Sequence, residues 1–263
     1  MTRVIAISLP EILQYLKIAC QIPSIADAIA SRKIIAEVAA ADGITVELTE
    51  LQQAADTVRI ANDLLTPEST WSWLAKHCLS VDEFEEIAHQ NVLSAKLAEH
   101  LLSDRVDPFF VAHQLDYTSA VLYEVVFEDE DLAIEVYYAL QEGEMQFYEV
   151  AQQYSQDVEL RRKGGYCGKI PRSELRPEIS AAVFAATPPQ LLRPIITPKG
   201  AHLIQVEEII QPELDESLRL QILSELFAEW LKQQLEQARL AVQLDPDQTV
   251  FTSSREVVQP QLS

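Results

Sequence analysis

The sequence predicts an α+β fold in which a four-stranded antiparallel sheet with its own helices is inserted between N-terminal helices and a long C-terminal helix of an all-α domain. Helix-start signals recur through residues 1–115, and after Asp116 the apolar pattern changes to that of strands. From Glu213 to about Ala241 the apolar residues return to helical spacing. A helix of about thirty residues is too long to be covered by a small sheet domain, so we expect the N-terminal helices to cover it.

These changes of pattern divide the chain into four parts. The parts are residues 1–115 (N-terminal helices), 116–211 (sheet domain), 212–242 (C-terminal helix) and 243–263 (a tail without periodicity, expected to be disordered). The chain has 263 residues, of which 48% are hydrophobic, so it can fill one sizeable core or two smaller ones. Two domains are the better expectation at this length.

The charge of the chain limits the partners it can have. With 41 acidic and 20 basic residues the net charge is -21, and a field of that sign repels phosphate backbones and anionic lipid surfaces. We therefore expect neither nucleic acid nor a membrane surface as a partner. An acidic surface also keeps a protein soluble, and this is the simpler explanation of the composition.

The cysteines indicate reduced thiols. Cys20, Cys78 and Cys167 are odd in number and form no Cys-x-x-Cys pair, which fits neither a disulfide framework nor a zinc site. The apolar run Val4–Leu9 is interrupted by Pro10 before it reaches the length of a signal-peptide core, and no run approaches the ~18 apolar residues of a membrane helix. We expect a cytoplasmic protein without membrane insertion, metal or cofactor.

The N-terminal part contains five recognisable helix starts. Capping residues predict helices that begin after Ser8, Ser24, Thr49, Thr66 and Ser80. Asp42-Gly43 supplies a stop for the second helix, because glycine accepts the left-handed conformation that closes a helix. The fifth helix should run to about Leu102 and be followed by a connector over residues 104–116, which contains Pro108.

The sheet domain begins with a run rich in β-branched and aromatic residues, 120–127, which predicts a buried strand. Asp129 should cap a helix that ends near Leu140. The remaining elements are expected to be helices near 146–154 and 178–186 and strands near 166–170, 191–197 and 202–209.

Three separated segments resemble the parvulin family of peptidyl-prolyl isomerases, also known as the rotamase or PpiC type. Residues 154–168 resemble the parvulin passage from a helix end into a Gly-Gly strand, residues 171–185 the next helix, and residues 197–208 the closing hairpin with its Gly-x-His. Their order and nearly ungapped spacing make the resemblance specific. The flanking helices, with Gly43-Ile44-Thr45-Val46 before one of them, resemble the SurA and PrsA class of foldases.

The resemblance implies a site without a nucleophile. Asp157 stands where parvulins carry cysteine or aspartate, His202 matches the second of two buried family histidines, and Thr197 matches the threonine beside it. The apolar slot for the proline ring would be lined by Leu175, Ile179, Cys167 and Phe184. Because rotation of the prolyl bond only requires loss of amide resonance, such a site needs an apolar slot and hydrogen-bond donors.

Other positions depart from the family pattern. Tyr123 aligns with the first-strand histidine, Ile179 replaces the phenylalanine of the slot, and Tyr166 lies in Gly-Gly-Tyr-Cys-Gly where the family has Gly-Gly-Asp-Leu-Gly. We expect the Tyr123 hydroxyl to hydrogen-bond His202 in place of the missing histidine. Whether the substituted site still catalyses isomerisation stays open at this point.

Two functions therefore follow from the sequence. The first is a prolyl isomerase and foldase acting on unfolded or proline-containing polypeptide clients. It would not be phospho-specific, because the acidic run Glu128–Asp131 stands where phosphate-directed parvulins need basic residues. The second is a non-catalytic chaperone or adaptor that binds extended polypeptide through a degenerate parvulin site. The oligomeric state does not follow from the sequence.

Overall fold

The structure, a computed structural model, describes residues 4–245 and 248–252 and divides into two compact units. The helical unit is built from both ends of the chain, up to Val106 and from Arg219 onward, and the sheet unit is the continuous stretch Asp107–Leu218. The described helices do not include one long and apolar enough to cross a membrane.

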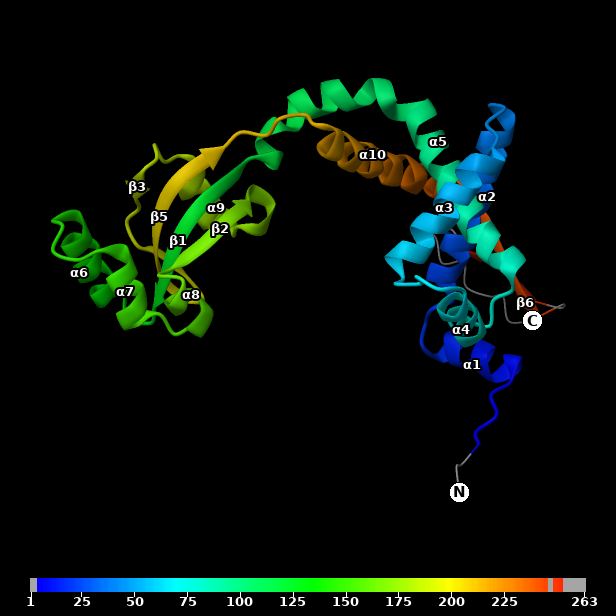
Figure 1. The fold of residues 1–263 in the computed structure, drawn as a ribbon, viewed down its shortest axis with the longest axis horizontal. Helices are drawn as coiled ribbons and strands as arrows, with labels where there is room; N and C mark the ends of the chain where they lie inside the picture. Colours follow the sequence, from blue (N-terminus) through cyan, green and yellow to red (C-terminus); the bar gives the residue numbers. More distant parts are fainter. Residues whose placement is uncertain (1–3, 246–247, 253–263) are drawn as a thin grey trace, which may run out of the picture. The chain divides into compact units, whose positions relative to one another are not determined.

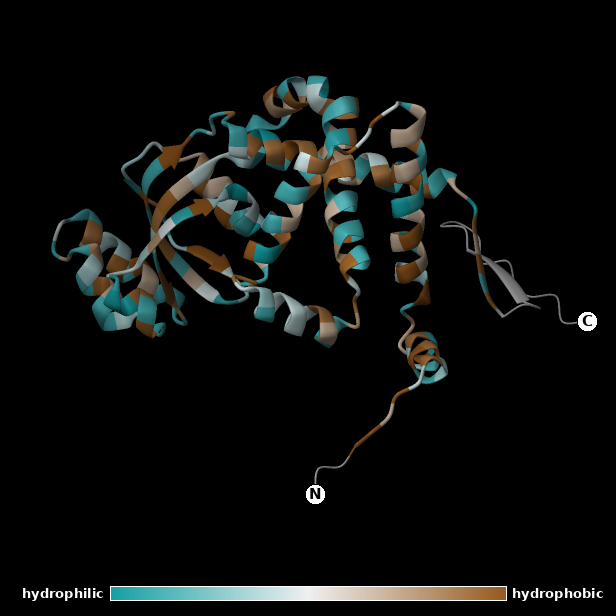
Figure 2. Ribbon diagram, turned by 45° about the vertical axis from the view of Figure 1, so that its right-hand side comes forward, coloured by the Kyte–Doolittle hydropathy of each residue, from teal (hydrophilic) through white to brown (hydrophobic). Residues whose placement is uncertain are grey.

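The helical unit is built mainly from amphipathic helices, whose mixed hydropathy is visible in Figure 2. They are α1 (Leu9–Ile18), α2 (Ile22–Ala41), α3 (Leu48–Ala61), α4 (Pro67–His77), α5 (Val81–His113) and α10 (Glu216–Gln237). The core of the unit joins Ile35 on α2 and Leu97 on α5 to Phe227 on α10. The C-terminal helix therefore buries its apolar side against N-terminal helices, as the sequence predicts (Figure 1).

Most of the predicted helix starts are confirmed. Ser8 and Glu11 form a capping box at α1, Thr66 caps α4, and the Ser80 hydroxyl lies 3.1 Å from the Glu83 amide at α5. The start predicted for the second helix is wrong, because α2 begins at Ile22. The Ser24 hydroxyl donates to the Gln21 carbonyl and so caps no amide. The third helix begins at Leu48, capped by Glu47, which is slightly earlier than predicted.

The predicted connector after the fifth helix is wrong, because α5 continues to His113 with Pro108 inside it. Proline removes one helical hydrogen bond and costs about 3 kcal/mol in a helix interior. The apolar spacing nevertheless continues past Leu102 to Val106, and both side chains are almost fully buried. We infer that this burial offsets the loss at Pro108. A short 3₁₀ turn, η1 (Gln114–Tyr117), then leads into the sheet.

The sheet unit contains a five-stranded antiparallel sheet. Its strands are β1 (Ser119–Phe127), β2 (Tyr166–Pro171), β3 (Gln190–Leu191), β4 (Ile195–Thr197) and β5 (Gly200–Ile210). The order is β2-β1-β5-β3, with β4 also paired to β5, and β1 lies between β2 and β5 in Figure 1. The strand predicted over 191–197 is interrupted near Pro194, which has no N–H to donate to a ladder. The predicted fold class is otherwise confirmed.

Helices cover both faces of the sheet. They are α6 (Glu130–Gln141), α7 (Phe147–Tyr154), α8 (Val158–Arg162) and α9 (Pro177–Phe184), with a 3₁₀ turn, η2 (Arg172–Glu174), after β2. Val125 and Leu203 pack with α6 and α7 on one face, which we call the α6–α7 face. Leu122 and Ile204 pack with Ile179 on the opposite face, which we call the α9 face. Successive strand residues thus point to different cores, so one residue of register decides where a side chain lies.

The C-terminal prediction needs correction. Helix α10 ends at Gln237, before the predicted end, and β6 (Leu240–Asp245) pairs antiparallel with β7 (Gln248–Thr252). The segment predicted to be a disordered tail is therefore partly a hairpin, since the β-branched and aromatic residues of β7 favour a strand. Residues 246–247 and 253–263 of that predicted tail lie outside the described residues.

Candidate active site

The centre of the candidate site is His202 on β5. Its side chain is only 5% exposed, and its ring points to the α9 face, as the alternation with Leu203 requires. Ring atom Nε2 lies 2.7 Å from the hydroxyl oxygen of Thr197 on β4. The same oxygen accepts a hydrogen bond from the backbone N–H of Lys199 at 3.1 Å. The sequence prediction that pairs Thr197 with His202 is therefore confirmed.

Gly200 makes this pairing possible. It has φ +127°, a conformation that favours glycine, and it pairs with Thr197 across the β4–β5 turn. A Cβ atom at this position would overlap the backbone carbonyl oxygen of Phe127 on β1. The absence of a side chain at residue 200 thus lets the turn lie close to β1 and holds Thr197 beside His202.

The second partner of His202 is Glu124, which the sequence analysis missed. Glu124 Oε1 lies 2.7 Å from Nδ1 of His202, across the β1–β5 pair. Both ring nitrogens are therefore occupied, and the predicted hydrogen bond from Tyr123 is wrong. A signal was present in the sequence, because Glu124 is the one charged residue in the apolar strand Ser119–Phe127.

Tyr123 lies on the opposite face of the strand. Its ring packs against Phe147 and Tyr166, with centroids 5.8 and 5.2 Å apart, as part of the α6–α7 face. Burial, followed by the nearby charge of Glu207, raises the pKa of the Tyr123 hydroxyl. The one-residue offset between Tyr123 and Glu124 changes the face of the sheet, which is why Glu124 reaches His202.

Cys167 and Asp157 lie close to this polar group. Burial raises the pKa of the Cys167 thiol to about 11, and the carboxylates of Glu124 and Asp157 add to the effect. The thiol is therefore neutral at physiological pH and lies 3.4 Å from the carbonyl oxygen of Gly165. Asp157 caps α8, where its Oδ1 accepts from the amides of Glu159 at 2.7 Å and Leu160 at 3.0 Å. The predicted loop position of Asp157 is thus a helix cap.

An apolar cluster borders the polar group. Ile179 on α9 is buried, and Leu175, Cys167 and Phe184 pack around it on the α9 face. The guanidinium of Arg172 lies over the Phe184 ring, 4.9 Å from its centroid. The four side chains predicted for the proline slot are therefore gathered in one cluster.

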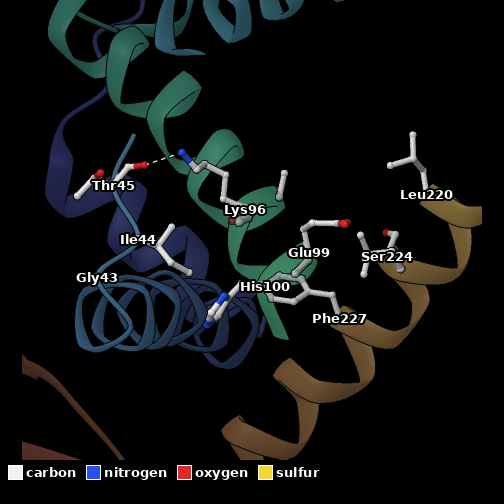
Figure 3. A pocket seen from close by; sticks show the side chains of 13 residues that line it. Gly43, Ile44, Thr45, Lys96, Glu99, His100, Leu220, Ser224 and Phe227 are labelled. Carbon is white, nitrogen blue, oxygen red and sulfur yellow. Dashed lines mark hydrogen bonds between the residues drawn. The ribbon is translucent and has the colours of Figure 1, made fainter. Parts of the chain in front are cut away.

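The helical unit offers a second candidate site. A groove of about 870 Å³ lies between α5, α10 and the loop after α2. Its apolar floor includes Ile44, Leu220, Leu223 and Phe227, and Lys96, Glu99 and His100 also line it (Figure 3). Lys96 donates to the carbonyl oxygen of Thr45 at 2.8 Å, which fixes one wall. Across the described residues, no cluster of His, Cys, Asp and Glu side chains could hold a metal ion.

Comparison with known proteins supports these features. Residues 128–208 match the family model described as "Rotamase: PPIC-type PPIASE domain". The chain is 22% identical over 193 residues to "Foldase protein PrsA" of Caldanaerobacter subterraneus subsp. tengcongensis, covering 73% of this chain and 59% of that protein. It is 30% identical over 122 residues to "Chaperone SurA" of Bordetella avium, covering 43% and 24%. The chain thus spans less than two thirds of the length of these curated relatives.

A solved structure shows a similar fold. The crystal structure of the peptidylprolyl isomerase PrsA from Bacillus cereus matches with a TM-score of 0.51 at 17% identity, covering 92% of this chain and 91% of that chain. At this identity the match speaks for the fold alone. The family match shows a PPIC-type domain over residues 128–208, and the structural match shows a PrsA-like fold.

Proposed function

We propose, on the premise that residues 128–208 form a PPIC-type rotamase domain, that this chain catalyses cis–trans isomerisation of Xaa-Pro bonds in unfolded polypeptide clients. The observation that carries the proposal is the hydrogen-bonded group Glu124–His202–Thr197, centred on the buried His202, beside the apolar cluster around Ile179. A polar group held in fixed geometry next to an apolar surface is the arrangement that this reaction requires.

The chemistry follows from the amide bond. Rotation about the prolyl C–N bond has a barrier of about 18–20 kcal/mol, because the planar amide is stabilised by resonance. The twisted amide is less polar than the planar one, so an apolar surface around Ile179 favours it and excludes water. Neighbouring hydrogen-bonding groups can hold the chain on either side of the proline while the bond turns. No covalent intermediate is needed.

The neutral state of Cys167 fits this scheme. Because its thiol pKa is about 11, the side chain presents an uncharged, weakly polar surface to a proline ring. A thiolate at this position would instead attract water, and its negative charge would be repelled by the carboxylate of Glu124. The same high pKa argues against a role for Cys167 as a nucleophile.

The helical unit supports a foldase role alongside catalysis. An open groove with an apolar floor and polar rim suits an extended chain with alternating apolar and polar residues, which is how unfolded clients present themselves. Binding there would keep a client near the rotamase unit and raise its local concentration. In the non-catalytic alternative, the parvulin site would bind extended polypeptide without turnover.

We also propose a cytoplasmic location, where thiols stay reduced. The support is that Cys20, Cys78 and Cys167 are free thiols, and two of them are exposed. Alkylation of intact cells of the source organism, followed by fractionation, should recover the protein in the cytoplasmic fraction with all three thiols free. Recovery outside the cytoplasm would contradict this location.

The activity is tested by protease-coupled or NMR-exchange kinetics on short Ala-Pro peptides, using the full chain. We expect the cis-to-trans rate to rise linearly with protein concentration. His202→Gln should lower the rate at least tenfold, because it removes the ring that joins Glu124 to Thr197. His113→Gln, an exposed histidine on α5, is the matched control and should leave the rate unchanged.

The same assay separates the two functions. Absence of any acceleration at micromolar wild-type protein, combined with suppressed aggregation of a denatured client, would leave only the non-catalytic chaperone. Asp157→Asn retains the α8 cap while removing the charge, and Asp157→Ala removes both. A loss of rate in Asp157→Ala alone would assign Asp157 to the helix cap, whereas a loss in both would assign its charge to the reaction.

A further inference from the structure

The hydrogen-bond group at the site has a defined direction, which can be assigned atom by atom. A carboxylate can only accept, so the 2.7 Å contact with Glu124 requires the hydrogen of His202 on Nδ1. In the neutral ring Nε2 is then an acceptor, and the Thr197 hydroxyl donates to it at 2.7 Å. The Thr197 oxygen in turn accepts from the Lys199 N–H at 3.1 Å. Each group therefore donates to the next in one direction, from the backbone N–H of the β4–β5 turn to the Glu124 carboxylate on β1.

Burial makes this direction costly to change. The His202 side chain is 5% exposed, so water cannot easily take the place of a partner at its ring, whereas the Glu124 side chain is 25% exposed. A buried ring nitrogen left without a partner costs about 1–3 kcal/mol. Glu124 thus selects one ring orientation and one tautomer out of those open to a histidine.

A histidine at the Glu124 position would act differently. The parvulin resemblance implies a first-strand histidine, and a pair of imidazoles can exchange donor and acceptor roles because each ring carries one of each in the neutral form. A carboxylate cannot exchange roles in this way. Glu124, and not the aligned Tyr123, contacts His202, so a carboxylate takes the place of the first-strand histidine as partner of the ring. This change removes the exchange of donor and acceptor roles from the site.

We propose that Glu124 is a positioning residue, whose carboxylate holds His202 with its hydrogen on Nδ1 and thereby keeps Nε2 as the acceptor that fixes the Thr197 hydroxyl, next to the apolar cluster around Ile179. This proposal rests on the proposed isomerase function. Glu124 acts through His202, and its effect should appear in the turnover of a bound peptide more than in its binding. The arrangement at residue 124 compensates for the absence of a second histidine.

The first readout is the tautomer of His202, observed by long-range ¹H–¹⁵N NMR correlation on the full chain. Wild-type protein should show the hydrogen on Nδ1. Glu124→Ala should shift the signals toward the other tautomer or an exchanging mixture. Because Glu124→Ala can also weaken the fold, Glu124→Gln serves as the isosteric variant, whose amide can turn its NH₂ group toward the ring. A His202 that keeps Nδ1–H unchanged in both variants would overturn the proposal.

The second readout is kinetic. We expect kcat to fall at least tenfold in Glu124→Gln and Glu124→Ala, with KM changed less than threefold. Glu124→His, which supplies a histidine as the partner of His202, should restore most of the lost kcat. Glu208→Gln, which removes an exposed carboxylate from the same sheet, is the matched control and should behave as wild type. Folded Glu124 variants with wild-type kcat would overturn the positioning role.

The two proposals fail in different ways. Wild-type protein without isomerase activity would overturn the proposed function and, with it, any role of Glu124 in turnover. Active wild-type protein with fully active Glu124 variants would overturn only the role of Glu124. A loss that appears solely in unfolding midpoints, with kcat of the folded fraction unchanged, would reduce Glu124 to a structural residue and also overturn the proposal.

Discussion

The hydroxyl of Thr197 lies 2.7 Å from Nε2 of the buried His202, on the neighbouring strand of a tight hairpin. This contact joins a ring in the sheet core to the turn that precedes β5. It also serves a backbone amide, that of Lys199, with the same oxygen atom. One hydroxyl group therefore provides a hydrogen-bond partner for both the His202 ring and the Lys199 amide.

We predict that Thr197→Val, which replaces the hydroxyl by a methyl group of similar size, leaves both neighbours without a partner. The expected cost is about 1–3 kcal/mol in the free energy of unfolding, measured by urea denaturation. Thr197→Ser retains the hydroxyl and should lose less than half of that amount. Equal destabilisation by the two substitutions would mean that packing of the methyl group, and not the hydroxyl, matters at this position.

Gly200 should tolerate no side chain. In Gly200→Ala the Cβ atom would overlap the carbonyl oxygen of Phe127, in addition to the strain of φ +127°. We expect a loss of roughly 3 kcal/mol or more and a lower isomerase rate, since β4 must move. Gly143→Ala is the matched control, because Gly143 also has a positive φ, +75°, but open space around it. Its cost should be about 1–2 kcal/mol.

The cysteines should differ sharply in reactivity. Cys20 and Cys78 are exposed, whereas the Cys167 thiol has a pKa of about 11. The thiolate is the reactive form, so at pH 8 Cys167 should alkylate about a hundredfold more slowly than an ordinary thiol. Its rate should rise as the pH approaches 11. Timed iodoacetamide labelling with mass spectrometry measures this, and equal labelling of all three cysteines in native protein would contradict it.

Lys96 on α5 joins α3 to the loop before it. Its ammonium lies 2.9 and 2.8 Å from the two carboxylate oxygens of Glu50 and 2.8 Å from the carbonyl oxygen of Thr45. The hydrogen bond from Lys96, followed by that from the Glu47 amide, lowers the pKa of Glu50. The native state therefore binds fewer protons at this carboxyl than the unfolded state does.

The sign of the pH dependence follows. The contribution of Glu50 to stability is fully present above the ordinary glutamate pKa and is lost as the pH falls through the lowered value. Glu50→Gln should therefore lower the urea midpoint at pH 7 and leave it nearly unchanged at pH 3. Glu68→Gln, in the first turn of α4, is the control and should show a smaller difference between the two pH values. A pH-independent effect of Glu50→Gln would contradict the assignment.

Phosphorylated substrates should be disfavoured. The exposed run Glu128–Asp131 follows β1 directly, so a phosphoserine before the proline would meet like charge. We expect kcat/KM on a phosphoserine-proline peptide to be several-fold below that on the serine-proline peptide. The difference should shrink in 0.5 M salt, because exposed charges are screened. Faster turnover of the phosphopeptide would reverse this conclusion.

Local signals explain most of what the sequence predicted. Capping residues such as Ser80 and the β-branched strand 120–127 act on their own neighbours, and the structure confirms both. The continuation of α5 through Pro108 was not predictable in this way, because burial of Val106 depends on distant parts of the chain. Likewise, Leu240–Asp245 forms a strand only through its partner β7.

In the site, too, the position of one residue depends on distant parts of the chain. The structure gathers Leu175, Ile179, Cys167 and Phe184 in one cluster and places Thr197 beside His202, while their roles in the site stay a prediction. The choice between Tyr123 and Glu124 depends on which residue faces α9, and the ladder between β1 and β5 shifts register after Val121. Residue type alone does not reveal such a shift. A charged residue inside an apolar strand was the available signal.

The assembly of the helical unit from both ends of the chain has a consequence for biosynthesis. The continuous stretch Asp107–Leu218 can close its own core as soon as its last residues leave the ribosome. The helical unit cannot close its core at that point, because Ile35, Leu93 and Leu97 pack against residues of α10, which is made later. During translation the N-terminal helices therefore expose apolar side chains until α10 has been synthesised. In that interval the nascent chain resembles an unfolded client, although its sheet unit can already be folded.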